Sequence, residues 1–238
     1  MGAKLAADLY YAGKISRQEA EYLLTFCNNP SPAFLITYVG NICLEGKMPV
    51  GNLAGVLFGA DMICMCFFRF IYIKNCKNRY KDGSCKQNYA KICSVETDAI
   101  KTEINLNKAE IDLSETDWGM VIDNGIMNGF ETITRLGGYI LLFSILSASI
   151  SHFWFFPLAG KYIFLGILEL TTGLHGLMIS GFSYQIRVLL AMCFCSFGGL
   201  CIMAQTKSVL GKELSLLPYA SAKCMNTAVT AILTLIFL

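Results

Sequence analysis

Two groups of polar residues interrupt otherwise apolar stretches of this sequence. The first group surrounds two prolines and contains Asn28, Asn29 and Ser31. The second group is spread over a longer stretch and contains Glu169, Thr171, Thr172, Ser196 and Gln205. Prolines, glycines and small hydroxyls leave backbone amides and carbonyls free to face a ligand, and helix N-termini attract anions. We predict that these eight residues bind a small polar or anionic solute.

The sequence carries no comparable pattern for catalysis or for a metal. The glycine-rich stretches are not followed by GKS or GKT, so they do not match a phosphate loop. No spacing of a nucleophile and a base stands out, and His152 and His175 are isolated. Most of the eleven cysteines lie in apolar runs, where cysteine behaves as a small hydrophobic residue. We predict no enzyme activity, no cofactor and no metal site.

Two carboxylates in apolar surroundings have alternative interpretations. Glu169 is a functional candidate because an ionisable group is costly in lipid. It could equally cap a helix or pair with a neighbour such as Lys161. For Asp61, a structural pair with Arg69 is favoured over a proton relay.

The composition places these residues in a membrane. Of 238 residues, 55% are apolar and 15% are charged, with a mean hydropathy of +0.52. Soluble domains carry about 25% charged residues, and several apolar runs are long enough to cross a bilayer as helices. We predict an all-α, polytopic transmembrane helical bundle with broken or re-entrant gate-type helices and an inverted-repeat, transporter-like organisation. The lipid bilayer is one partner, nucleic acid is not, and homo-oligomerisation is left open.

The order of elements can be read from apolar runs, caps and prolines. Residues 1–73 are predicted to hold two short helices over 3–26, a broken helix over 31–45 and a span over 53–73. The second short helix starts at a capping box, Ser16–Glu19. Residues 74–117 form a charged loop whose lysines place it in the cytoplasm. Residues 118–238 hold an amphipathic helix over 118–132, spans over 134–151, 187–205 and 219–238, and a broken segment over 157–181.

The two membrane halves share a spacing. The distance in sequence from Gly2 to Phe26 is the same as that from Gly173 to Phe197. In each half a glycine precedes a short helix, a turn, a pair of leucines and a polar break. This is the pattern of inverted repeats that place a binding site at their interface.

Several motifs together resemble the sporulation integral membrane protein YlbJ family. They occupy residues 2–10, 13–21, 26–29, 136–144, 168–173 and 196–205, and the resemblance covers the chain apart from 74–117. It implies a nucleoside-recognition gate domain, as also found in concentrative nucleoside transporters and the ferrous-iron transporter. It further implies a multi-pass protein of the bacterial cell membrane, with the outer forespore membrane as one location. The implied role is in sporulation, passing dipicolinic acid toward the forespore.

Two features depart from that family. Its members carry an additional N-terminal membrane half that ends in a glycine- and proline-rich motif, and Met1 stands where that motif would finish. We therefore expect an N-terminally truncated member. Asp61 also stands where the family pattern has a His-Tyr pair.

The function predicted from the sequence is transport by alternating access, with broken helices moving around a site near mid-membrane. The Glu169→Gln and Asn29→Ala substitutions should then abolish solute movement. The alternative is a non-transporting scaffold or partner subunit that acts through the 74–117 loop. Deleting the loop would remove a scaffold's function, whereas a transporter should keep part of its activity.

Overall fold

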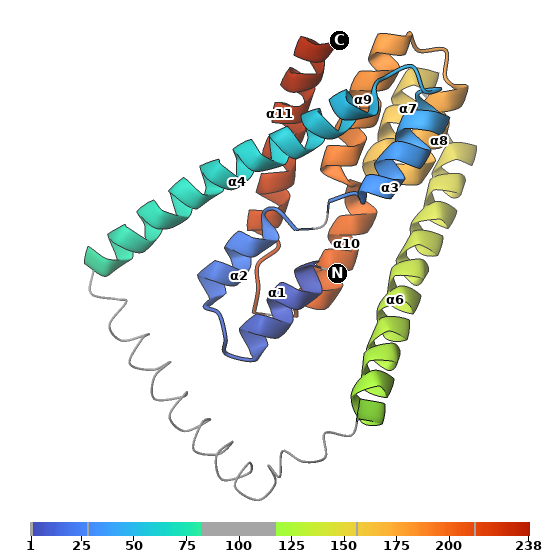
Figure 1. The fold of residues 1–238 in the computed structure, drawn as a ribbon. Helices are drawn as coiled ribbons and strands as arrows, with labels where there is room; N and C mark the ends of the chain where they lie inside the picture. The colour runs from blue at the N-terminus through green and yellow to red at the C-terminus, as the bar shows by residue number, and fades with distance from the viewer. Residues whose placement is uncertain (1, 28, 82–117, 156, 212) are drawn as a thin grey trace, which may run out of the picture. The chain divides into compact units, whose positions relative to one another are not determined.

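A computed structural model describes residues 2–27, 29–81, 118–155, 157–211 and 213–238 (Figure 1). Every regular element in these ranges is a helix, which confirms the predicted all-α fold. The helices in chain order are α1 (Gly2–Tyr11), α2 (Arg17–Leu24), α3 (Pro32–Phe34), η1 (Leu35–Cys43), α4 (Val50–Lys81), α6 (Trp118–His152), α7 (Leu158–Leu168), α8 (Leu170–Ile179), α9 (Tyr184–Phe197), α10 (Gly199–Leu210) and α11 (Leu217–Phe237).

Four stretches of the described residues are long and apolar enough to cross a membrane: Val50–Tyr72, Gly125–His152, Tyr184–Leu210 and Leu217–Phe237. These agree with the polytopic bundle predicted from composition. The third stretch combines α9 and α10. The loop predicted over 74–117 begins as a continuation of α4, and its remainder lies outside the described residues.

Two predicted elements are in fact one. The amphipathic helix expected over 118–132 and the span expected over 134–151 form the single helix α6. No proline separates them, and a helix continues where its backbone bonds are not interrupted. Along this helix Ile122, Ile126, Phe130 and Ile133, which follow one another at intervals of three or four residues, are largely exposed.

The described chain divides into two compact units. The first combines Met1–Arg69 with Arg135–Leu238, and the second is Phe70–Thr134. Both groups of predicted site residues belong to the first unit.

Two buried clusters hold the first unit together. One joins η1, the start of α4, α8 and α9 through residues such as Leu35, Leu53, Leu174, Leu177 and Met192. The other joins α1, α2, the end of α10 and the start of α11 through Ala6, Ala20, Leu24, Leu210 and Tyr219. Three alanines of α1 are buried, and α1 packs on α10. Small side chains allow this close approach, as in membrane helix pairs.

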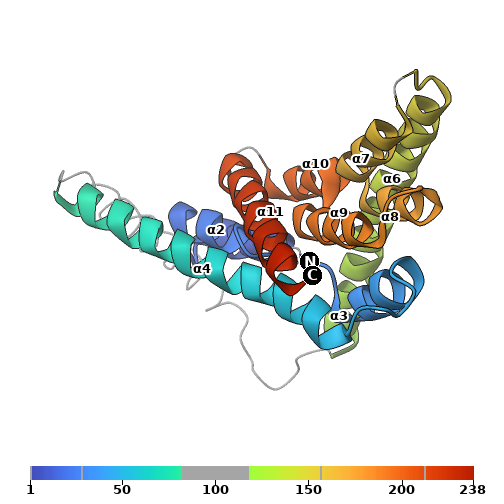
Figure 2. The same cartoon turned by 90° about the horizontal axis from the view of Figure 1, so that it is seen from above.

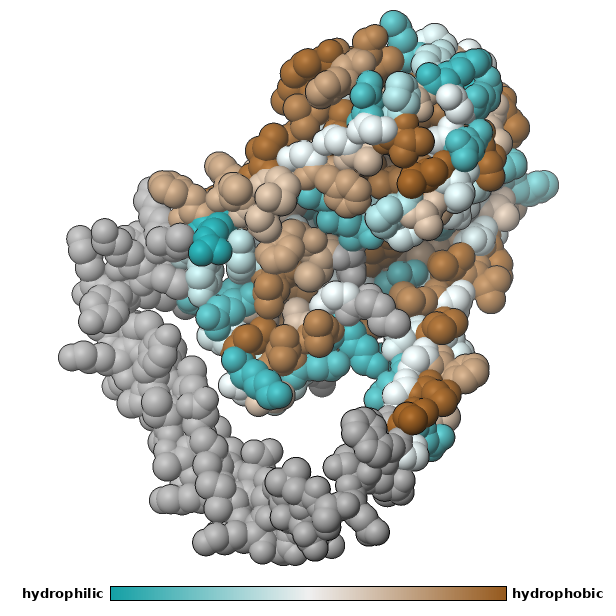
Figure 3. All heavy atoms as spheres, viewed as in Figure 1, coloured by the Kyte–Doolittle hydropathy of each residue, from teal (hydrophilic) through white to brown (hydrophobic). Residues whose placement is uncertain are grey.

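Large apolar side chains also remain on the surface of the first unit. On α6 these include Leu141, Leu142 and Ile145, and at the end of α11 they include Leu235 and Ile236. Figure 3 shows hydrophobic residues over the end of α11. An exposed apolar surface of this kind suits contact with lipid chains.

The helix order of the first unit occurs twice. Helices α9, α10 and α11 follow α2, α3 and α4, respectively, at one constant offset in sequence, and α8 follows α1 at nearly the same offset. Helices α1 and α8 are also equal in length. The glycine spacing in the sequence pairs Gly2 with Gly173, whereas the helix starts pair Gly2 with Leu170. The register of the repeat in the structure therefore differs from that of the glycine spacing by three to four residues, about one helical turn.

The two copies run in opposite directions. Figure 1 shows η1 rising away from the centre of the first unit, whereas α10 descends from it. Figures 1 and 2 both show α7 beside α8 and α9 beside α11. The contacts are reciprocal as well, because α1 packs on α10 while α8 packs on η1. Two oppositely directed copies that pack on each other form an inverted repeat.

Candidate functional site

Helices α7 and α8 form a tight hairpin whose tip is Glu169. Their C-terminal and N-terminal ends are separated only by Glu169, which has an extended backbone. A Cβ added to Gly173 would lie 2.1 Å from the Cα of Gly166, and one added to Gly176 would lie 2.7 Å from the ring of Tyr162. These pairs are spaced symmetrically about the tip, so the two helices run antiparallel. The predicted broken segment is therefore an antiparallel hairpin of two helices that are each too short to cross a bilayer, the form expected of a re-entrant segment.

The carboxylate of Glu169 caps helix α8. It accepts hydrogen bonds from the backbone N–H groups of Thr171 and Thr172, at 2.9 and 2.6 Å, and from both threonine hydroxyls at 2.7 Å. Glu169 is 4% exposed. The three predicted residues thus form one cluster, and Glu169 makes the local capping contacts that were one of its two predicted alternatives. Because the protein's own carboxylate occupies this helix N-terminus, an anionic solute would have to compete with it.

The tip of the hairpin touches the break between α9 and α10. Gly198 and Gly199 both have positive φ angles, 81° and 84°, which favour glycine. A Cβ at Gly199 would lie 3.3 Å from the carbonyl oxygen of Leu168 and 3.4 Å from the backbone nitrogen of Leu170. Two interruptions of helical backbone therefore meet inside the first unit, where broken backbone in a membrane protein needs protein or water partners.

Ser196 and Gln205 lie on either side of this break. Ser196 is buried, and its hydroxyl accepts a hydrogen bond of 3.1 Å from Thr230 of α11. Gln205 is further along α10, where its amide nitrogen lies 3.3 Å from the sulfur of Cys201. Ser196 is thus tied to the following long helix, whereas Gln205 interacts within its own helix. No hydrogen bond between Gln205 and the hairpin tip occurs among the described residues.

The first repeat has its own break, between α2 and α3. Ser31 caps α3 by accepting from the backbone N–H of Phe34 at 3.2 Å. The predicted capping box at Ser16 and Glu19 is present at the start of α2. A Cβ at Gly2 would lie 3.0 Å from the sulfur of Cys27, so the start of α1 packs on this break as the start of α8 packs on the other. Asn28 lies outside the described residues.

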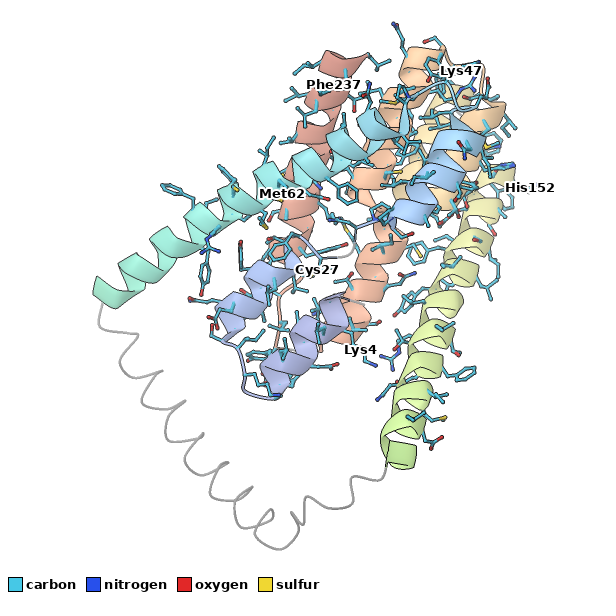
Figure 4. The ribbon with its side chains drawn as sticks, in the orientation of Figure 1. Lys4, Cys27, Lys47, Met62, His152 and Phe237 are labelled. Carbon is cyan, nitrogen blue, oxygen red and sulfur yellow. The ribbon has the colours of Figure 1, made fainter. Side chains whose placement is uncertain are left out.

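Asn29 connects this break to two long helices through charged partners. Its amide nitrogen donates to Asp61 of α4 at 2.7 Å and to the backbone carbonyl of Phe26 at 3.3 Å. Its amide oxygen accepts a hydrogen bond of 2.8 Å from the ammonium of Lys223 on α11. Figure 4 labels Cys27 beside the break and Met62, the neighbour of Asp61, on α4. The amide therefore bridges an acidic and a basic side chain.

A second amide completes this cluster. Asn226 donates to the other carboxylate oxygen of Asp61 at 2.5 Å, and its own oxygen accepts from the thiol of Cys64 at 3.7 Å. Lys223 is 1% exposed, and its ammonium lies 5.8 Å from the ring centroid of Tyr219. We call Asn29, Asp61, Lys223 and Asn226 the charge cluster. It belongs to the middle of the bundle, because Asp61 is the central residue of the candidate span Val50–Tyr72.

The predicted pairing of Asp61 with Arg69 is wrong. Eight residues along a helix separate the two by about 12 Å, too far for a direct ion pair. Sequence reasoning also missed Lys223 and Asn226. A lysine within the predicted span 219–238 was the available signal, since an ionisable residue inside a span is expected to have a partner and a function.

Charged residues also meet at the turn between η1 and α4, which lies outside the candidate spans. Glu45 accepts from Lys47 and, at 2.9 Å, from Arg187 of α9. The bond from Lys47 and then that from Arg187 lower the pKa of Glu45 below its ordinary value. This contact ties the turn of the first repeat to the second.

The predicted solute-binding residues that the structure describes thus fall mainly at two breaks, one in each repeat. Glu169, Thr171 and Thr172 lie at the hairpin tip with Ser196 near the adjoining break, whereas Asn29 and Ser31 lie at the break of the other repeat. Both breaks are tied to the long helix that follows them. In the first repeat the partners are charged, and in the second they are two hydroxyl groups.

Comparison with known proteins gives one relevant match. The chain is 19% identical over 254 residues to the sporulation integral membrane protein YlbJ of Bacillus subtilis (strain 168), covering 99% of this chain. The described residues also include four apolar stretches of membrane-spanning length. The chain is a membrane protein related to YlbJ. It spans 60% of the length of YlbJ. No protein-family profile and no solved structure matches the chain.

Proposed function

We propose that this protein is a transporter that carries a small anionic solute across a bacterial membrane, and not an enzyme. The observation that carries the proposal is the contact between the re-entrant hairpin and the α9–α10 break. In membrane transporters, interrupted helices at the interface of inverted repeats form the solute site, and movement of one repeat against the other exposes it alternately to each side.

The resemblance to YlbJ supports a narrower proposal about the solute. YlbJ is named as a sporulation membrane protein, and its family is associated with passage of dipicolinate toward the forespore. We propose dipicolinate as the solute and the outer forespore membrane as the location. A planar dianion of this size could be held by hydroxyls, amides and a cationic side chain, all of which occur at the two breaks.

Flux measurements in liposomes test this proposal. Purified protein is reconstituted, and uptake of radiolabelled dipicolinate is compared with that of protein-free liposomes. We expect uptake by the wild type and its loss in Asn29→Ala. Asn128→Ala, on the exposed part of α6, is the matched control and should keep wild-type uptake. Helical circular dichroism of each variant establishes that it is folded.

Two results would contradict the proposal. Wild-type uptake no faster than that of protein-free liposomes would reject dipicolinate transport. Equal uptake by folded Asn29→Ala and Asn128→Ala would remove Asn29 from the site.

A further inference from the structure

The charge cluster contains an acidic side chain, Asp61, and a basic side chain, Lys223, and the amide of Asn29 bridges them. Each carboxylate oxygen of Asp61 accepts a hydrogen bond from an amide, at 2.7 and 2.5 Å, which is the arrangement expected for an ionised carboxylate. Lys223 donates to the oxygen of the same Asn29 whose nitrogen donates to Asp61. The amide thus presents its negative end to the cation and its positive end to the anion.

Both charges lie where the bilayer makes an isolated charge costly. Lys223 is fully buried in the candidate span Leu217–Phe237, and Asp61 is central in the candidate span Val50–Tyr72. Removing the charge of one partner would leave the other uncompensated in a poorly solvated environment. The cluster is therefore stable with one negative charge beside Lys223, whatever group supplies it.

An anionic solute also needs a cation inside the membrane. The N-terminus of α8 is already occupied by the carboxylate of Glu169. Among the described residues, Lys223 is the basic side chain that is buried, and it contacts the α2–α3 break, one of the two breaks that we propose hold the solute. Its present counter-ion is Asp61, bridged to it by Asn29.

We propose that Lys223 binds a carboxylate group of the solute and that Asp61 gives up its role as counter-ion by taking up a proton. The proton comes from hydronium or buffer acid in the solvent, which is left as its conjugate base, and it forms an O–H bond on a carboxyl oxygen of Asp61; no other covalent bond is made or broken. One proton is then taken up for each carboxylate bound, so the charge of the cluster is unchanged. This inference rests on the proposed function, because it assumes an anionic solute.

An experiment must distinguish protonation of Asp61 from protonation of the other titratable groups that face it. They are Lys223 of α11, Cys64 of α4 and, through Lys223, Cys27 at the break. A protonated carboxyl group has its own infrared carbonyl band, which neither a thiol nor an ammonium produces. The difference spectrum between wild type and Asp61→Asn therefore reports on Asp61 alone.

The experiment uses the full chain in lipid nanodiscs with dipicolinate as the probe. At fixed neutral pH, we expect dipicolinate to produce the carboxyl band in wild type and not in Asp61→Asn. Calorimetry in two buffers of different ionisation enthalpy should give uptake of one proton per dipicolinate in wild type and none in Asp61→Asn. Asp61→Asn should still bind dipicolinate, with an affinity that no longer changes with pH.

A neutral double variant tests the role of Lys223 without leaving an uncompensated charge. Asp61→Asn with Lys223→Met should fold and should lose dipicolinate binding at least tenfold relative to Asp61→Asn alone. Lys207→Met, on the exposed end of α10, is the control and should bind as wild type does.

The outcomes distinguish this inference from the proposed function. Dipicolinate binding that is unaffected in the double variant, or that produces no carboxyl band and no proton uptake, overturns the inference and leaves transport standing. Absence of dipicolinate binding to wild type overturns the inference together with the proposed solute.

Discussion

Gly166 and Gly173 face each other across the α7–α8 hairpin so closely that a Cβ at Gly173 would lie 2.1 Å from the Cα of Gly166. This contact brings two backbones together without intervening side chains, which is how small residues act in membrane helix pairs. It also explains how α7 and α8 can pack antiparallel although Glu169 alone separates them in sequence.

Gly173→Ala should therefore separate the hairpin arms. We expect the free energy of unfolding to fall by about 3 kcal/mol or folding to fail, because the added methyl overlaps backbone rather than a movable side chain. Thermal loss of helical circular dichroism in detergent measures the effect. Gly181→Ala is the matched control, since a Cβ there meets nothing within 4 Å. Equal melting of both variants would contradict the close packing.

Glu169→Gln should destabilise the protein, and its loss of transport should follow partly from that. The carboxylate accepts four hydrogen bonds, whereas glutamine offers one oxygen and turns an amide donor toward backbone N–H groups. We expect a loss of about 2 kcal/mol. Glu169→Asp, which keeps a capping carboxylate, should lose less when melting temperatures are compared. A stable Glu169→Gln variant would show that the cap contributes little.

Gly199→Ala should also destabilise the protein, because alanine resists the positive φ of 84° and its methyl would press on the hairpin tip. A loss of about 1–2 kcal/mol is expected from the backbone conformation alone. Gly55→Ala in α4 serves as the comparison, because its Cβ would meet open space and alanine favours helix. Equal melting temperatures for Gly199→Ala and Gly55→Ala would be evidence against a rigid contact between Gly199 and the hairpin tip.

Asp61 and Lys223 should show strong coupling in a double-mutant cycle. Each single neutralisation, Asp61→Asn or Lys223→Met, leaves a buried charge and should lower the free energy of unfolding by about 3 kcal/mol. The double variant should lose less than the sum, by about 1–3 kcal/mol. Chemical unfolding of the four proteins measures the cycle, and additive losses would mean that the two charges act independently.

Acid should weaken the contact between Glu45 and its two cationic partners. The pKa of Glu45 is lowered in the folded protein, so its contribution to stability is present above the ordinary glutamate pKa of about 4.3 and is lost as pH falls through the lower folded value. Glu45→Gln should lack this part of the acid dependence. Melting temperatures measured from neutral to acidic pH compare it with Asp8→Asn, which removes an exposed carboxylate elsewhere. If melting temperature depends on pH in the same way in Glu45→Gln and Asp8→Asn, the contact of Glu45 with Lys47 and Arg187 does not form in solution.

The sequence predicts those features that local chemistry determines. The capping box at Ser16, the apolar spans and the interruption at Glu169 all follow from residue types and spacing, and the structure contains each of them. The spacing of the glycines indicates the two copies of the helix order, but in a register that is shifted by a few residues. Such a shift is expected because a helix can lengthen by part of a turn without losing its packed face.

Long-range partners could not be predicted in the same way. Asp61 and Asn226 are 165 residues apart in sequence, and Asn29 and Lys223 are 194 apart. Their contact depends on how the two copies pack, which no local pattern encodes. The same reason explains why the sequence could not show how Asn29 and Ser31 at one break lie relative to Glu169, Thr171, Thr172 and Ser196 at the other.

The unequal chemistry of the two breaks has an energetic consequence for the proposed transporter. In a protein built from oppositely oriented copies, the states open to either side arise when the copies exchange conformations. Identical copies would make these states equally populated. Here one break is held by a charged pair and the other by the hydroxyls of Ser196 and Thr230. A difference of about 1.4 kcal/mol between them would favour one state tenfold, so the empty protein should rest facing a single side of the membrane.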